Sequence, residues 1–212
     1  MQLILIIFQI IVLIFSVIIH EISHGYLALK LGDRTAKDSG RLTINPAKHI
    51  DPIGSIFLPF FLAIAGLPII GWAKPVPYNP NNLKNPKKGA GFIALAGPLS
   101  NIILAVIFAL IIRVMGGFSN SGLSPSILLL NFIVLINLLL AFFNLIPIPP
   151  LDGSKILFSL LPRSAFRFES WMSRYGMIVI LLILFTVGFG FLWPLVESIH
   201  HFLVGPVSAL IF

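Results

Sequence analysis

The sequence predicts an all-α polytopic membrane protein, a helical bundle of about four to six membrane segments with short re-entrant or extended segments. Of its 212 residues, 58% are hydrophobic and only 10% are charged, and the mean hydropathy is +1.03. Soluble domains average about 25% charged residues, so this composition cannot cover a surface exposed to water. We therefore predict one integral membrane domain over residues 1–212, with a catalytic core at about 3–155 and C-terminal membrane segments at about 175–212.

The first predicted span covers residues 3–29, which form an apolar run that ends at Lys30. As a helix this run is about 40 Å long, enough to cross a hydrocarbon core of about 30 Å. The polar stretch 30–48 follows, and its alternating residues 41–46 suggest a short strand. Residues 51–70 are apolar but rich in proline and glycine, which indicates a re-entrant or broken segment. Residues 71–88, with four prolines, are predicted to be loop or extended chain.

A second clean span is predicted over residues 89–112, where small or polar residues three or four apart permit close approach of another helix. A Gly/Ser-rich connection at 114–124 leads to a span over 126–143 and then to a polar, proline-kinked segment at 144–153. A further span is predicted over 177–193. Residues 195–212 are apolar but interrupted, so the sequence leaves open an interfacial helix or a further span.

The basic residues indicate orientation and not nucleic-acid binding, although the formal net charge is +7. Nine of the 14 Lys and Arg residues lie in 30–88 and four in 148–174, while Arg113 alone borders 114–124. They flank apolar spans, as expected of cytoplasmic loops, so both basic segments should face the same side. The chain has no cysteine, which leaves His and carboxylates as the strong metal ligands.

The most specific motif is His20-Glu21-Ile22-Ser23-His24, at the end of the first span. His20 and His24 are four residues apart, so on a helix they lie on one face and can bind one cation. Glu21 lies beside them and can take a proton from a metal-bound water, as in zinc proteases. The alternative is a pair of core histidines with a buried, paired Glu21.

The depth of the residues along the spans predicts the third ligand. His20 lies 17 residues from Leu3 and Asn144 lies 18 from Ser126, which places both at about 26 to 27 Å from the outer face. Asp152 follows Asn144 in the kinked segment and can fold back beside the two histidines near the cytoplasmic edge. Catalytic zinc takes three protein ligands and a water, so Asp152 is the predicted third ligand. Five other acids sit in polar loops or in the tail, where a solvated role is expected: Asp33, Asp38, Asp51, Glu169 and Glu197.

These motifs together resemble the site-2 protease family of intramembrane zinc metalloproteases. HEISH at 20–24 is similar to its HExxH motif and 144–153 to its Asn/Pro/Asp-Gly motif. AGPLSN at 96–101 and GWAKPVP at 71–77 are similar to stretches of its compact prokaryotic branch, without a PDZ or nucleotide-binding domain. The resemblance implies that His20, His24 and Asp152 bind zinc and that Glu21 is the catalytic acid/base. It also implies that Asn144 helps to bind the substrate backbone or the oxyanion.

The function that follows is hydrolysis of peptide bonds in or near transmembrane segments, with one Zn²⁺ per chain. The expected partners are a transmembrane protein substrate and the lipid bilayer, with no nucleic acid. The expected location is the cell membrane of a prokaryote, with the active site near the cytoplasmic side. Extended chain near 41–45 and 71–76 is expected either to pair with an unwound substrate or to serve as plain connecting loops. The oligomeric state is left open.

Three other interpretations remain open. A metal transporter would also place His and acids in spans, although it would need them along a route across the bilayer. A zinc protease facing the cytosol would use Glu as its third ligand. An inactive relative is the third. The remaining histidines, His49, His200 and His201, are expected to lie in loops or at the interface. Asn131 and Asn137 are expected to form hydrogen bonds between helices, with lining of a water path as the alternative.

Overall fold

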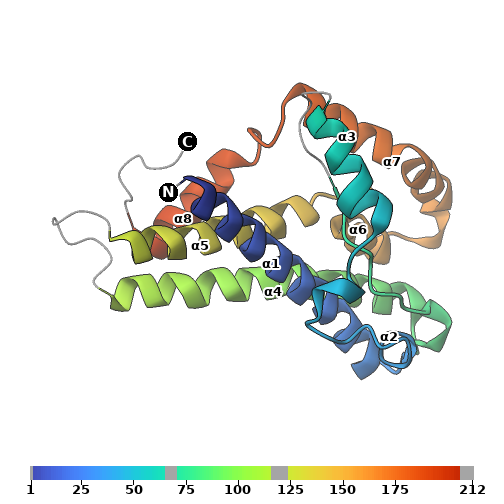
Figure 1. Ribbon diagram of the computed structural model, residues 1–212. Coiled ribbons are helices and arrows are strands. Elements are labelled where there is room, and N and C mark those ends of the chain that lie inside the picture. The colour runs from blue at the N-terminus through green and yellow to red at the C-terminus, as the bar shows by residue number, and fades with distance from the viewer. Residues whose placement is uncertain (1, 65–70, 116–123, 206–212) are drawn as a thin grey trace.

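The computed structural model describes residues 2–64, 71–115 and 124–205, and within these ranges all regular secondary structure is helical (Figure 1). Four helices are long and apolar enough to cross a membrane, which confirms the predicted fold class. They are α1 (Gln2–Lys30), α4 (Pro86–Val114), α5 (Pro125–Asn144) and α7 (Phe166–Thr186). The shorter elements are α2 (Thr35–Asp38), η1 (Pro46–Lys48), η2 (Pro52–Phe57), α3 (Leu58–Ile64), η3 (Pro80–Asn82), α6 (Asp152–Leu160), η4 (Arg163–Ala165) and α8 (Trp193–Val204).

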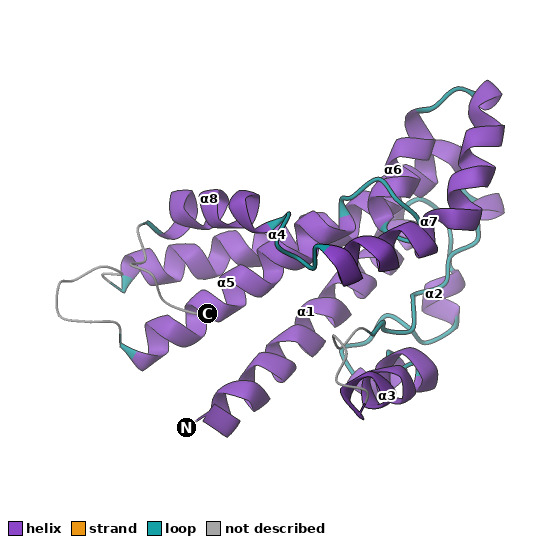
Figure 2. Ribbon diagram, turned by 90° about the horizontal axis from the view of Figure 1, so that it is seen from above, coloured by secondary structure: helices purple, strands orange, loops and turns teal. Residues whose placement is uncertain are grey.

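Helix α4 is the centre of the bundle, because α1, α5, α6 and α8 all pack against it. Figure 2 shows α4, α5 and α8 side by side, with α1 running past them. The core where α4 meets α5 and α8 is built on Ala105 and Ala109, whose small side chains allow close approach. This agrees with the small residues predicted to face another helix in this span.

Sequence signals set the starts of α4 and α5. The Asn85 side chain accepts a hydrogen bond from the backbone N–H of Lys88, and Pro86 occupies the first helical position. The Ser124 hydroxyl accepts from the N–H of Ile127, and Pro125 follows it. Capping by Asn or Ser with proline at the next residue satisfies free N–H groups and preorganises the backbone. Because Asn85 caps α4, this helix starts at Pro86, three residues before the predicted span.

The segment after residue 50 agrees with the re-entrant interpretation. Within the described residues, 52–64 form a continuous π-helical and α-helical rod of about 20 Å, shorter than a hydrocarbon core of about 30 Å. The backbone N–H of Trp72 donates to the carbonyl of Gly54, at 3.1 Å, so the chain returns to where this rod begins. Residues 65–70 of the predicted segment lie outside the described residues.

The last span is displaced from its prediction. The helix covers Phe166–Thr186 and not 177–193, so its first half includes polar and basic residues that lower the hydropathy. Gly176 lets this half approach the chain after α5, because a Cβ there would lie 2.5 Å from the carbonyl oxygen of Pro149. The helix ends before Gly188, whose φ of 64° is left-handed.

Residues 41–46 and the C-terminal segment also differ from, or add to, what the sequence predicts. The short strand predicted over 41–46 is wrong, because the Thr43 carbonyl accepts from the imidazole of His49 (Nε2 to O, 2.8 Å) and Asn45 caps η1. In the undecided tail, α8 spans 12 residues, or about 18 Å, which is shorter than a crossing. It packs on α4 and α5 through Val196 and Val204, and 206–212 lie outside the described residues.

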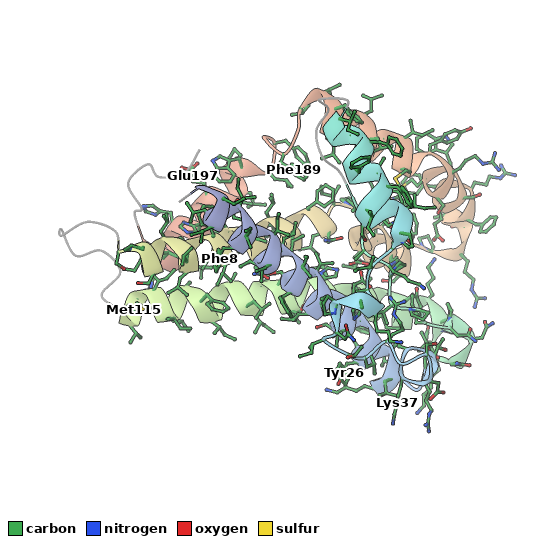
Figure 3. The ribbon with its side chains drawn as sticks, in the orientation of Figure 1. Phe8, Tyr26, Lys37, Met115, Phe189 and Glu197 are labelled. Carbon is green, nitrogen blue, oxygen red and sulfur yellow. The ribbon has the colours of Figure 1, made fainter. Side chains whose placement is uncertain are left out.

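The long helices place the two basic segments at the same end of the bundle. Chain direction puts the end of α1, the start of α4, the end of α5 and the start of α7 together. Figure 3 shows Tyr26 and Lys37 at one end of the molecule and Met115 and Glu197 toward the other. This arrangement agrees with the charge distribution that predicted a common side for 30–88 and 148–174.

Candidate metal centre

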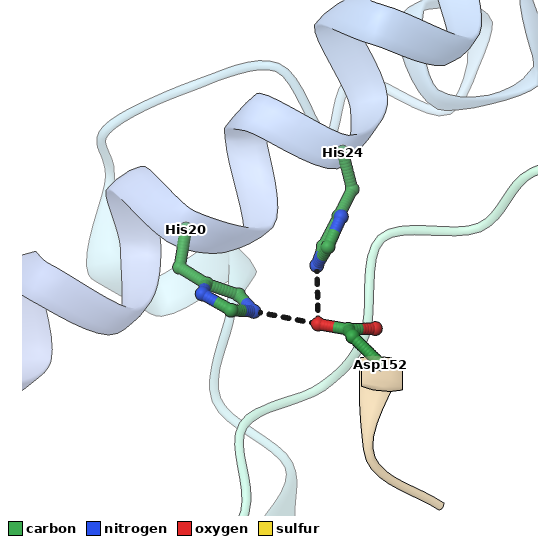
Figure 4. Close-up of side chains that lie close together, drawn as sticks. All are labelled: His20, His24 and Asp152. Atoms are coloured by element: carbon green, nitrogen blue, oxygen red, sulfur yellow. Dashed lines mark hydrogen bonds and ion pairs between the residues drawn. The ribbon is translucent and has the colours of Figure 1, made fainter. Parts of the chain in front are cut away.

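Three potential metal ligands meet where α1 passes the start of α6 (Figure 4). The Nε2 atoms of His20 and His24 each lie 3.0 Å from Oδ2 of Asp152. All three side chains are buried, with 5%, 8% and 5% of their surface exposed. The structure therefore brings together the two histidines and the acid that the sequence singled out as ligands.

The hydrogen bonds of the two rings indicate which nitrogen is free to bind a metal. Nδ1 of His24 lies 2.6 Å from the carbonyl oxygen of Ile93, which can only accept, so this nitrogen is protonated. Nδ1 of His20 lies 2.7 Å from Oδ1 of Asn101. The Asn101 amide is oriented by its Nδ2, which donates to the carbonyl of Ser16, so Oδ1 is the acceptor for His20. In the neutral rings, both Nε2 lone pairs consequently face Asp152.

This donor set fits a divalent cation. The two Nε2 lone pairs and the Asp152 oxygen, 3.0 Å from each nitrogen, repel one another unless positive charge lies between them. Protons alone would require one proton in each of the two contacts, so at least one ring would be a buried imidazolium with its centroid only 4.7 Å from that of the other ring. A tetrahedral zinc ion with bonds near 2.0–2.1 Å would hold its donor atoms about 3.3 Å apart, close to the observed separations. His, His and carboxylate are also a ligand set of catalytic zinc, in which a fourth position stays open.

Behind His20, a chain of buried polar side chains links three helices. Asn101 of α4 donates to Oδ1 of Asn137 on α5 (2.8 Å), and Asn137 donates to the hydroxyl of Ser16 on α1 (3.0 Å). Both asparagines are fully buried. Outer groups of this kind fix the orientation and tautomer of a ligating histidine. Asn101 and Asn137 were expected to pack helices, and the contact with His20 was not predicted, although an Asn in an apolar span is a signal for it.

Gly97 lets the backbone of α4 approach the ligand nitrogens. A Cβ built on this residue would lie 2.5 Å from Nε2 of His20 and 2.5 Å from Nε2 of His24. Real Cβ atoms do not come this close, and both rings are anchored at Nδ1. Glycine at this position therefore preserves the space in which the two imidazoles converge.

Substitution Gly97→Ala should weaken zinc binding. The added methyl group must push at least one imidazole away, and we expect roughly 10- to 100-fold lower affinity, the range seen when groups that orient metal ligands are lost. Competition with a chromogenic chelator measures the affinity. Gly190→Ala is the matched control, because its Cβ would meet only the carbonyl of Val187 at 3.4 Å. Equal affinities in both variants would contradict this role of Gly97.

Asp152 reaches the histidines because the chain reverses after α5. Residues 145–151 turn back, and Asp152 begins α6, which packs on α4. Gly153 makes the reversal possible, since a Cβ there would collide with the carbonyl oxygens of Leu145 and Ile146. Lys155 donates from Nζ to Oδ1 of Asp152, at 3.1 Å.

Glu21 is half-buried beside the ligands and contacts the extended chain after residue 70. Its Oε2 accepts a hydrogen bond of 2.7 Å from the backbone N–H of Val76. The carboxylate is thus held by a segment far away in sequence, while Oε1 has no hydrogen bond among the described residues. A carboxylate with one oxygen anchored and one free is able to exchange a proton with a neighbouring water.

Asn144 lies at the end of α5, and its side chain is half-buried. Its Nδ2 donates to the carbonyl of Leu140, at 3.0 Å, within the same helix. The side-chain oxygen has no hydrogen bond among the described residues. The role that the resemblance implies for Asn144 stays a prediction.

The other polar candidates lie outside this cluster, and the predicted surroundings of two of them, His200 and Asp33, are wrong. Among the described residues, His20, His24 and Asp152 form the one group of three or more His and acidic side chains close enough to share a metal ion. His200 is buried and bonded to Asn131 (3.0 Å) instead of lying at an interface.

Asp33, expected to be solvated, is fully buried and accepts hydrogen bonds from Thr35, Asn79 and Asn82. Burial alone would raise the pKa of its carboxyl, but these donors outweigh it and the pKa is lowered. Asp33 thereby fixes the chain before α4 to the end of α1.

Comparison with known proteins identifies the family. The profile of the peptidase family M50 matches residues 114–184, which include Asp152. The chain is 39% identical over 199 residues to the Bacillus subtilis (strain 168) protein named "Putative zinc metalloprotease YwhC", covering 90% of this chain and 86% of that protein. The chain belongs to peptidase family M50. This confirms the resemblance to site-2 proteases and the enzyme class that it implied, a zinc metalloprotease.

Other relatives match over less of their length. The Mycolicibacterium smegmatis protein named "Putative zinc metalloprotease Rip2" is 29% identical over 172 residues, which are 81% of this chain and 64% of that protein. The Mycobacterium tuberculosis (H37Rv) protein of the same name is 31% identical over 139 residues, 65% of this chain and 51% of that protein. No solved structure matches the chain.

Proposed function

We propose that this M50 protein is an intramembrane protease that holds one zinc ion with His20, His24 and Asp152 and cleaves peptide bonds in or near transmembrane segments. The observation that carries the proposal is the convergence of the three ligand atoms, each within 4.8 Å of the others, among four helices able to cross a membrane. A site at this depth acts on peptide bonds that enter the bilayer region.

The chemistry is divided between the metal and Glu21. When bound, zinc would lower the pKa of a water molecule toward neutrality and polarise the substrate carbonyl. Glu21 would accept the proton of the attacking water on the free Oε1 and later deliver it to the departing amine. The hydrogen bond from Val76 would keep the carboxylate oriented during both transfers.

The substrate must unwind locally, because the carbonyls of a transmembrane helix are bonded within the helix. Asn144 would help to bind the exposed substrate backbone or the oxyanion through its side-chain amide, as the resemblance implies. Extended chain at 71–76 offers the N–H and carbonyl of Ala73, which are unpaired among the described residues, for pairing with a substrate strand. Lys74 is less suitable, since its N–H already donates to the carbonyl of His49 at 2.8 Å.

Location follows from the charges. With both basic segments on the cytoplasmic side, His20, His24 and Asp152 would lie near the cytoplasmic edge of a prokaryotic cell membrane. The partners of the enzyme would be transmembrane proteins and the surrounding lipid, and no nucleic acid.

A reconstituted cleavage assay tests the function. Purified protein in detergent should contain about one zinc per chain and cut a synthetic transmembrane peptide that carries a helix-destabilising Asn-Pro pair. The chelator 1,10-phenanthroline should stop cleavage, its non-chelating 1,7 isomer should not, and added zinc should restore it. Cleavage of a soluble loop peptide in place of the transmembrane peptide would overturn the intramembrane assignment, and bound metal without any hydrolysis would favour a transporter.

A further inference from the structure

The extended chain over residues 71–79, here called the strap, lies against α1 and is fixed at several points. Its central residue Val76 is buried, and a Cβ on Gly25 of α1 would lie 2.8 Å from the Val76 side chain. The N–H of Val76 donates to Glu21, and the N–H of Asn79 donates to Asp33, both at 2.7 Å. The strap therefore determines where the Glu21 carboxylate can sit.

Arg41 fixes the strap from the side facing away from Glu21. Its guanidinium Nη2 donates to the carbonyl oxygens of Lys74, at 2.7 Å, and Pro75, at 3.2 Å. The side chain is buried, with 7% of its surface exposed, and its Nε has no hydrogen-bond partner within the described part of the chain. Burying a cation with one unpaired donor costs free energy of folding. The two hydrogen bonds to the strap offset part of this cost.

The two contacts meet on one peptide group. The Pro75 carbonyl that accepts from Arg41 and the Val76 N–H that donates to Glu21 belong to the same amide. In a trans peptide the oxygen and the hydrogen point to opposite sides, so the group is bonded to a cation on one side and an anion on the other. Hydrogen bonds in such a chain polarise and strengthen one another.

We propose that Arg41 is a positioning residue for the general base: it acts on Glu21 through the Pro75–Val76 peptide. This inference rests on the proposed function of Glu21. Proline on both sides of Val76 restricts the strap to extended conformations, so the peptide transmits the position of Arg41 to the carboxylate. Arg41 is separated from the substrate and the reacting atoms by the strap and contributes by orienting Glu21.

Substitution Arg41→Met should lower kcat for the transmembrane test peptide and leave KM and zinc content unchanged. Misplacing a general base that contributes about 10²- to 10⁴-fold should cost roughly 10- to 100-fold in kcat. Arg41→Lys keeps the charge but loses the planar fork, so it should recover part of the loss. Arg34→Met is the matched control, because Arg34 is an exposed cation in the same loop that pairs with Asp38.

A double-mutant cycle separates positioning from general damage to the fold. Val76→Pro removes the N–H that holds Glu21, in a backbone already restricted by two prolines. If Arg41 acts through this N–H, the two losses should not multiply. The kcat of the Arg41→Met/Val76→Pro protein should then lie within about threefold of the lower of the two single-variant kcat values. Multiplied losses, an Arg41→Met kcat within twofold of wild type, or loss of zinc in that variant would each overturn the proposal.

Failure of this inference can be told from failure of the proposed function. If Glu21→Gln is inactive but Arg41→Met is fully active, Glu21 remains the base and Arg41 does not position it. If Glu21→Gln is fully active, the proposed mechanism itself is wrong. Thermal unfolding of each variant in detergent identifies proteins that have lost their fold. If Arg41→Met is one of them, the kcat of Arg41→Lys is compared with that of the wild type instead.

Discussion

The Glu21→Gln protein should keep its zinc and lose about 10²- to 10⁴-fold of its cleavage rate, the contribution expected of a general base. Glutamine has the same shape as glutamate, and its side-chain oxygen can still accept the 2.7 Å hydrogen bond from Val76. The strap should stay in place, and the three ligands are untouched. Only the ability to take up a proton is removed. Single-turnover cleavage of the transmembrane peptide and metal analysis of the same sample measure both effects.

The control for this variant is Glu197→Gln. Glu197 is an exposed acid on α8, toward the opposite end of the molecule from Lys37 (Figure 3), so its loss should change neither zinc content nor rate. A Glu21→Gln enzyme as active as wild type would refute the assignment of Glu21 as the base. Loss of zinc in this variant would instead mean that Glu21 helps to hold the metal.

The convergence of the three proposed ligands could be predicted because local geometry and depth determine it. His20 and His24 share a helix face through their spacing alone, whatever the rest of the chain does. Asp152 follows from two similar distances along the chain, 17 residues from Leu3 to His20 and 18 from Ser126 to Asn144, and the chain reversal after Asn144 brings it to the histidines. Such inferences need only the helical rise and the direction of each span.

The groups around the ligands could not be predicted in the same way. The contact of Asn101 with His20 and the space kept by Gly97 depend on how closely α4 approaches α1, which sequence spacing does not give. The burial of Asp33 depends on the backbone N–H of Asn79, which is 46 residues away in sequence. Arg41 contacts only backbone carbonyls, so no partner side chain in the sequence points to it.

The misplaced elements show where hydropathy is a poor guide. α7 starts in a polar stretch that hydropathy does not count as part of the span. Backbone hydrogen bonds of a helix continue across the boundary between a basic interface and the membrane, so the helix begins before its apolar part. Residues 41–46 alternate as a strand would, but no neighbouring strand is present in the described part of the chain to pair with them. Alternation indicates a strand only where a partner edge exists.

Asp152→Asn should lower zinc affinity by more than about 100-fold, beyond the 10- to 100-fold that follows when only an outer group is lost. The amide is neutral and can offer only one oxygen, so two imidazoles would remain to hold the ion without the charge of the carboxylate. Cleavage should fall with metal occupancy and return only in part at high zinc. Chelator competition and the zinc dependence of the rate measure the two effects.

The competing acids provide matched controls for Asp152→Asn. Glu169 pairs with Lys87 (Oε1 to Nζ, 2.8 Å), and Glu197 is exposed on α8, so neither carboxylate belongs to the group that converges on the histidines. Glu169→Gln and Glu197→Gln should therefore bind zinc as tightly as the wild type. Zinc loss in either of them, with retention in Asp152→Asn, would move the third ligand from aspartate to glutamate. The enzyme would then fit the alternative class of zinc proteases that face the cytosol, and the position of its active site within the membrane would no longer follow.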